Sequence, residues 1–103
     1  MSDRIAALER MLEQRPDDAR LRFGLALEYE RAGRDEDVVS ALHAYLHSAE
    51  DEGNAWGRLA TALERIGRVE EAREALQTGV AQALAHGHPT MADEFRERLA
   101  DLS

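Results

Sequence analysis

Residues 25–36 read LALEYERAGRDE, and residues 59–70 read LATALERIGRVE. The two stretches carry the same Leu, Ala, Glu, Arg, Gly, Arg and Glu at matching positions, 34 residues apart. An Ala-Leu pair recurs at the same interval, at residues 7–8, 41–42 and 75–76. A fixed period of this size is typical of chains built by stacking similar supersecondary units. The sequence therefore predicts a repeat fold.

The composition indicates an all-α chain. Ala, Leu, Glu and Arg, which are good helix formers, dominate the sequence, and Pro occurs only twice in 103 residues. All 13 basic residues are Arg. We interpret this as the codon bias of a GC-rich genome, which indicates a bacterial protein.

The charge argues against two classes of partner. The chain has 21 acidic and 13 basic residues, a formal net charge of -8. Repulsion from phosphate groups predicts that it binds neither nucleic acid nor an anionic membrane surface. There is no Cys, and no apolar stretch has the length of a signal peptide or a membrane span. We therefore expect a cytoplasmic protein without disulfides.

Turn signals divide the chain into six helices. Pro16 and Asp18 mark a helix end followed by an N-cap, and Gly33 and Gly67 suit the left-handed residue after a helix end. Polar connections fall at 48–53 and again near residue 87. The predicted helices span about 3–14, 18–32, 35–48, 53–66, 69–86 and 89–102.

The spacing within each repeat follows a known family pattern, W-x2-L-G-x2-Y followed by A-x3-F. The second repeat supplies Trp56, Leu59, Ala60, Leu63, Gly67, Ala72 and Leu76. The first supplies Arg22, Leu25, Ala26, Tyr29, Gly33, Val38 and Leu42. On these residues the chain resembles the tetratricopeptide repeat family. Trp56 matches a packing position of that family, so we expect it to lie in the core.

The resemblance implies a right-handed solenoid of helix-turn-helix repeats, about two and a half of them with a C-terminal cap helix. Residues 1–103 would form one domain. Its expected parts are an N-terminal half-repeat helix at 3–14, repeat one at 19–52, repeat two at 53–86 and the cap helix at 89–102.

The resemblance also implies a non-enzymatic module that binds a partner peptide or helix in the concave groove lined by the first helix of each repeat. The groove positions are Arg20, Phe23, Leu27, Glu30 and Arg31 in repeat one, and Asn54, Gly57, Thr61, Glu64 and Arg65 in repeat two. Phe23 and Leu27 would form an apolar floor beside a small gap at Gly57, and an aromatic side chain in a groove suits a binding anchor.

Two alternatives remain open for Phe23 and Leu27. They can instead pack against the N-terminal helix or the cap helix, or they can join copies of the chain as a homodimer or a structural subunit. Some members of the family clamp a carboxylate tail with Lys and Asn. Because Phe23 and Leu27 stand at those positions, we expect no such clamp here.

The sequence predicts no catalytic residue, cofactor or metal. No Ser lies in a nucleophile elbow and no Gly-rich phosphate loop is present. His43 and His47 have the i, i+4 spacing of metal ligands, but a structural zinc site takes four ligands and these two positions suit a solvated surface. His86 and His88 flank Gly87 at a helix end, where a protonated imidazole would favour the negative end of the helix dipole.

Overall fold

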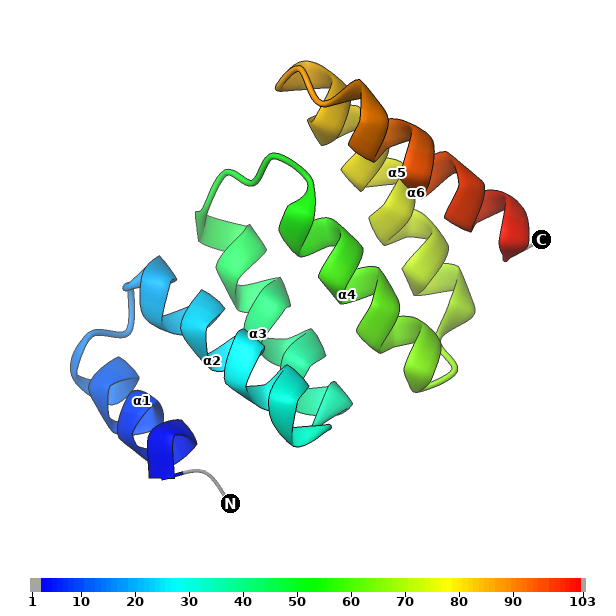
Figure 1. Cartoon of the computed structure of the whole chain (residues 1–103). Coiled ribbons are helices and arrows are strands. Elements are labelled where there is room, and N and C mark those ends of the chain that lie inside the picture. Colours follow the sequence, from blue (N-terminus) through cyan, green and yellow to red (C-terminus); the bar gives the residue numbers. More distant parts are fainter. Residues whose placement is uncertain (1–2, 103) are drawn as a thin grey trace. The chain divides into compact units, whose positions relative to one another are not determined.

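The structure, a computed structural model, describes residues 3–102, which form six α-helices and contain no strand. The helices are α1 (Asp3–Gln14), α2 (Ala19–Ala32), α3 (Asp35–Ser48), α4 (Asn54–Arg65), α5 (Val69–Ala85) and α6 (Pro89–Asp101) (Figure 1). The all-α class is confirmed, and every predicted helix boundary falls within one residue of the observed one. None of these helices combines the length and the apolar character that crossing a bilayer requires.

The chain divides into two compact units, the first ending at Ala49 and the second beginning at Glu50. The first unit contains α1, α2 and α3, and the second contains α4, α5 and α6.

In the first unit, α2 packs against α1 on one side and against α3 on the other. Asp18 caps α2 as predicted, because its Oδ1 accepts hydrogen bonds from the backbone N–H groups of Arg20 at 3.0 Å and Leu21 at 3.2 Å. The core between the helices is made of Ile5, Leu21, Leu25, Ala26, Tyr29, Val38, Val39 and Leu42.

The two predicted glycine turns have the same geometry. Gly33 and Gly67 adopt positive φ values of 72° and 80°, which a residue with a Cβ adopts only with strain. In both turns the next backbone N–H closes onto a carbonyl five residues back: Arg34 donates to Tyr29 at 2.9 Å, and Arg68 donates to Leu63 at 2.8 Å. These closures fold α2 onto α3 and α4 onto α5 as antiparallel hairpins (Figure 1).

An ion pair at the start of the second helix of each hairpin also repeats. Arg34 Nε lies 2.8 Å from Asp37 Oδ2, and Arg68 Nε lies 2.6 Å from Glu71 Oε2. The acidic partners stand in the first turns of α3 and α5, where a carboxylate favours the positive end of the helix dipole. The 34-residue period of the sequence is thus a period of local structure as well.

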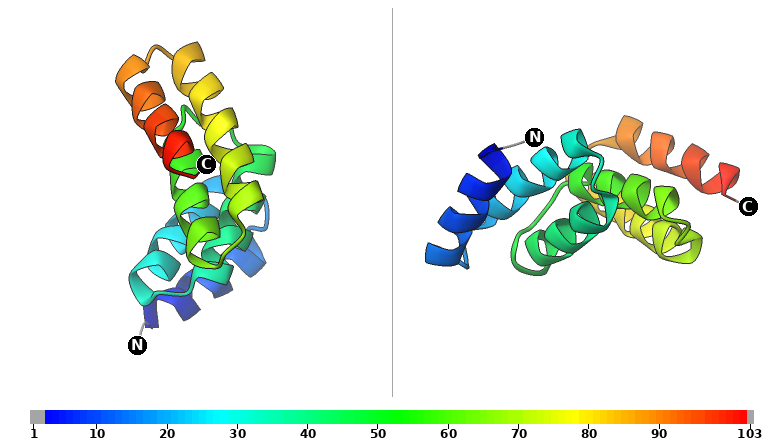
Figure 2. Two further views of the ribbon diagram at one scale, coloured as in Figure 1. Left: turned by 90° about the vertical axis from the view of Figure 1, so that its right-hand side faces the viewer. Right: turned by 90° about the horizontal axis from the view of Figure 1, so that it is seen from below.

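In the second unit, α5 lies between α4 and α6 in contact with both, and α6 runs antiparallel to α5 (Figures 1 and 2). Its core contains Ala55, Leu59, Ala60, Ala62, Leu63, Ala72, Ala75, Leu76, Ala83, Ala92 and Phe95. Trp56 was expected in this core, but the structure leaves it half-buried. Small residues of α4 and α5 form most of that core, and α6 covers them with Phe95.

Candidate functional site

The predicted groove residues of the first repeat lie along α2. Arg20 and Arg31 are exposed, while Phe23, Leu27 and Glu30 are half-buried. We call these five residues the α2 face. It has an apolar middle, made by Phe23 and Leu27, with an arginine toward each end.

Phe23 does not stand alone on this face. Its ring packs on the ring of Tyr45 from α3, with centroids 5.1 Å apart and planes inclined by 47°. A tilted aromatic pair of this kind is mutually stabilising and holds the Phe23 ring in place. The alternatives for Phe23 were packing against the N-terminal helix, the cap helix or a second copy of the chain. None of them included this contact with α3, the other helix of the same hairpin.

Gly24 follows Phe23 in the middle of α2. A Cβ built on Gly24 would meet no atom within 4 Å. Nothing in this structure therefore requires a glycine there, although glycine weakens a helix interior.

The predicted groove residues of the second repeat form the α4 face, and three of the five are covered by α6. Asn54 and Arg65 are exposed, Thr61 and Glu64 are half-buried, and Gly57 is buried. The small gap expected at Gly57 exists, but the ring of Phe95 fills it. A Cβ on Gly57 would lie 2.8 Å from that ring, and a Cβ on Gly79 of α5 would lie 2.9 Å from it.

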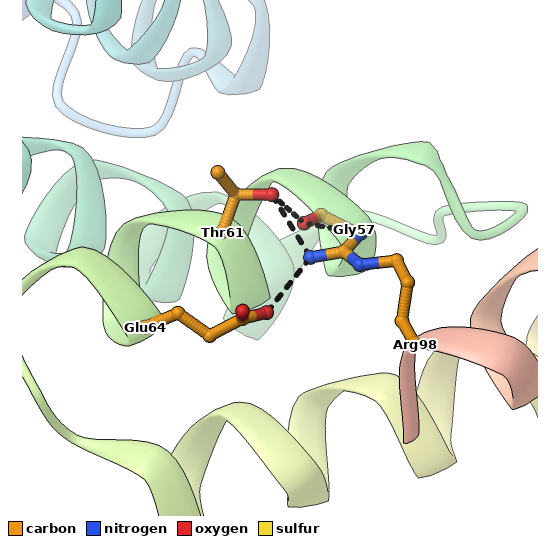
Figure 3. A network of polar contacts seen from close by, with 4 residues as sticks. All are labelled: Gly57, Thr61, Glu64 and Arg98. Atoms are coloured by element: carbon orange, nitrogen blue, oxygen red, sulfur yellow. Dashed lines mark hydrogen bonds and ion pairs between the residues drawn. The ribbon is translucent and has the colours of Figure 1, made fainter. Parts of the chain in front are cut away.

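Arg98 of α6 makes a polar network across the same face (Figure 3). Its Nη2 donates to Thr61 Oγ1 at 2.9 Å and to Glu64 Oε2 at 3.1 Å, and its Nη1 donates to the carbonyl of Gly57 at 3.4 Å. Thr61 Oγ1 in turn donates to the Gly57 carbonyl at 3.1 Å. The α4 face thus seats a helix of its own chain through one aromatic ring and one guanidinium.

Sequence reasoning missed a buried carboxylate in the first unit. Glu28 of α2 is only 8% exposed. Its Oε2 accepts from Arg4 Nε of α1 at 3.0 Å and from Arg31 Nη1 at 3.4 Å. The sequence did contain a sign of this burial, because Glu28 lies on the same side of α2 as Leu21 and Leu25. The three residues follow the i, i+4, i+7 spacing of a buried stripe.

Tyr29 makes a second polar contact between α1 and α2. Its hydroxyl donates to Glu9 Oε2 at 2.6 Å. Burial of the phenol, followed by this hydrogen bond and the nearby negative charge, raises the pKa of Tyr29 to about 12. The guanidinium of Arg34, 4.8 Å from the ring centroid, acts in the opposite direction.

No histidine belongs to the α2 face or the α4 face. His43 and His47 are exposed on α3, and within residues 3–102 no group of three or more acidic or histidine side chains is placed to hold a metal. His88 Nε2 lies 2.5 Å from Oε1 of Glu52, which precedes α4. The hydrogen bond with His88 lowers the pKa of Glu52.

Comparison with known protein families finds no match, and comparison with curated protein sequences finds none either. Among solved structures, the chain is similar to protein BPP2914 from Bordetella parapertussis, whose structure was determined in solution. The two are 29% identical, the similarity covers 99% of this chain and 89% of the other, and the TM-score is 0.79. That similarity supports the all-α fold and names no activity.

Proposed function

We propose that this protein is a non-enzymatic protein-interaction module, built as a tetratricopeptide-like right-handed solenoid, that holds a helix or extended segment of a partner on the α2 face. Phe23 and Leu27 are the apolar anchors. Arg20 and Arg31 pair with acidic groups of the partner at the ends of the segment.

The observation that carries the proposal is the way the α4 face accepts α6. Gly57, Thr61 and Glu64 are the residues 34 positions after Phe23, Leu27 and Glu30. At this place in the repeat, the chain seats an amphipathic helix with a buried ring and a charge-assisted hydrogen bond. The α2 face offers the same positions, with larger apolar side chains in place of the glycine gap.

The test is affinity capture from a lysate of the source organism, with mass spectrometry of the retained proteins. The baits are the native chain and the Phe23→Glu/Leu27→Glu variant. A matched control is the Met11→Glu/Leu84→Glu variant, because Met11 and Leu84 are 42% and 47% exposed and lie outside the α2 face. Circular dichroism verifies that all three baits keep their helices.

A protein retained by the native chain and the control variant but lost with Phe23→Glu/Leu27→Glu supports the proposal. A protein retained equally by all three baits contradicts it. Retention of the chain itself as the only prey, with a molar mass in light scattering that rises with concentration, would replace it with the self-assembly alternative.

A further inference from the structure

The exposed side of α3 carries two histidines that the proposed function does not use. His43 and His47 are both exposed, and they lie four residues apart on the helix Asp35–Ser48. Residues at this spacing lie on the same side of a helix, one turn apart, with about 6 Å between their Cβ atoms. Two imidazole rings at that separation can bind one small ligand together.

Both rings are available to a ligand from solvent. Within residues 3–102 neither ring takes part in a hydrogen bond, an ion pair or a ring contact. The other two histidines differ from them, because His88 is hydrogen-bonded to Glu52 at 2.5 Å and His86 is half-buried. His43 and His47 are therefore the pair whose ring nitrogens are exposed and unoccupied by another side chain.

The surroundings of this pair along α3 are uncharged. No Asp, Glu or Arg occurs between Asp37 and Glu50, so the second half of α3 has no carboxylate to pair with either ring and no guanidinium to repel a cation. His47 lies in the last turn of α3, where the negative end of the helix dipole favours a positive charge. The net charge of -8 adds a long-range attraction for cations.

The chemistry of two imidazoles selects the kind of ligand. Neutral imidazole nitrogen binds divalent transition-metal ions such as nickel, copper and zinc, whereas magnesium and calcium prefer oxygen ligands. A structural zinc site takes four protein ligands, and within residues 3–102 no group of three or more histidine and acidic side chains is placed to provide one. A site made of two imidazoles is therefore an open one, with water at the other coordination positions.

We propose that His43 and His47 form an exchangeable surface site for a divalent transition-metal ion, held by one nitrogen of each ring and completed by water. The second imidazole acts from the same helix, so its effective concentration is high and the pair binds more tightly than either ring alone. Because the two rings have this spacing only while α3 is helical, bound metal also stabilises the folded chain. The site is independent of the α2 face and of its partner.

The test follows the melting temperature of the chain by circular dichroism at neutral pH and constant ionic strength, over a range of nickel chloride concentrations. We expect the melting temperature to rise with nickel, and to go on rising with the logarithm of its concentration once the site is saturated. Magnesium chloride is the control for a general attraction of cations to the carboxylates. The rise with nickel should exceed the rise with magnesium at every concentration.

Three variants locate the binding, and calorimetric titration gives their affinities. His43→Gln and His47→Gln each remove one ligand at an exposed position, and each should weaken nickel binding at least about tenfold. The matched control is His43→Gln/Ser40→His, in which Ser40 is also exposed. This control keeps two imidazoles on α3 but separates them by seven residues, about 10 Å along the helix, so it should bind no better than the single variants.

Nickel also reports its own position, because it is paramagnetic and broadens the NMR signals of nearby nuclei. In the ¹⁵N-labelled native chain, the amide signals around His43 and His47 should broaden at lower nickel concentration than those around His86 and His88. Nickel that broadened the signals of His86 and His88 first would be bound at the turn between α5 and α6, and the inference would be wrong.

Two further results would overturn it. One is a rise in melting temperature with nickel that is no greater than the rise with magnesium, and the other is full nickel affinity in His43→Gln/Ser40→His. All the substituted side chains are exposed, so the variants should fold without metal, and circular dichroism in its absence verifies this. None of these outcomes depends on the capture experiment, which tests the protein-binding function separately.

Discussion

Two glycines of the first helices stand in opposite surroundings, although both interrupt a helix interior. Gly57 of α4 gives the Phe95 ring the space it occupies, because a Cβ would lie 2.8 Å from that ring. Gly24 of α2 has open space where its Cβ would be. The same residue type therefore has a packing role in one helix and none within the described chain in the other.

Replacing each glycine by alanine separates the two roles. Gly24→Ala should raise the free energy of unfolding by up to about 1 kcal/mol, because alanine favours the helix and meets no obstacle. Gly57→Ala should lower it by about 1–3 kcal/mol, because the Phe95 ring must shift to accept the new methyl group. Urea unfolding followed by circular dichroism measures both. Stabilisation by Gly57→Ala would show that the ring has room to move.

Ionisation of Tyr29 should make the first unit less stable at alkaline pH. The raised pKa, about 12 against an ordinary value of 10.0, means that the folded state favours the neutral phenol. The corresponding stability is complete below pH 10 and is lost as pH rises from 10 through 12, since the unfolded chain then releases the proton more readily.

We therefore expect the native chain to lose about 1 kcal/mol of unfolding free energy between pH 9 and pH 11 through this residue. Tyr29→Phe cannot ionise and should lack this component, while at pH 7 it should be less stable by roughly 1 kcal/mol through the lost hydrogen bond to Glu9. Unfolding curves at several pH values for the two proteins provide the comparison. If the unfolding free energy of the native chain and of Tyr29→Phe fell in parallel between pH 9 and pH 11, the loss would not come from Tyr29.

At the scale of the element, α6 acts on α4 and α5 together. Phe95 lies in the space left by Gly57 and Gly79, and Arg98 spans Gly57, Thr61 and Glu64. The outward positions of α6, by contrast, are polar and exposed, among them Asp93, Glu94, Arg96 and Glu97. α6 therefore has an apolar inner side, which packs on α4 and α5, and a polar outer side.

Phe95 should be the energetic anchor of α6. Phe95→Ala removes a buried ring from between two glycines that cannot fill the space, so we expect a loss of about 3–5 kcal/mol in unfolding free energy. Arg98→Ala should cost roughly 1 kcal/mol, because Arg98 and Glu64 are both about one-third exposed and water screens their attraction. Thermal melts of the two variants show which substitution destabilises the chain more. A larger effect of Arg98→Ala would mean that the polar network, and not the ring, holds the helix.

At the scale of the whole molecule, charge is the dominant property. The formal net charge is -8, and ion pairs such as Arg34–Asp37, Arg68–Glu71 and Arg96–Asp93 join exposed side chains. Exposed pairs contribute little, so they do not offset the mutual repulsion of the excess carboxylates.

Added salt should therefore stabilise the chain at neutral pH. Raising sodium chloride from about 20 to about 500 mM shortens the screening length severalfold, and the melting temperature should rise because the repulsion weakens more than the ion pairs do. The control is the same series near pH 5, where partial protonation of the carboxylates reduces the net charge and the rise should shrink. A melting temperature that falls with salt at pH 7 would show that the ion pairs outweigh the repulsion.

The sequence by itself determined the six helices and their turns, because the signals that set them act within a few residues. Asp18 caps α2 through its own next turn, and Gly33 and Gly67 close their helices through bonds to the residues just before them. The candidate face on α2 stays a prediction, because Phe23 and Leu27 were assigned to it from the resemblance to the repeat family and not from a contact within the chain.

Only the tertiary structure decided which residues meet across distance. It brought Phe95 and Arg98 onto the α4 face from about 40 residues further along the chain, left Trp56 half-buried, and placed Glu28 in a hollow beside α1. Periodicity shows which side of a helix is apolar, but it does not show which side chain of another helix fills a gap. That choice depends on the shapes and charges of both surfaces, and they come together only in the folded chain.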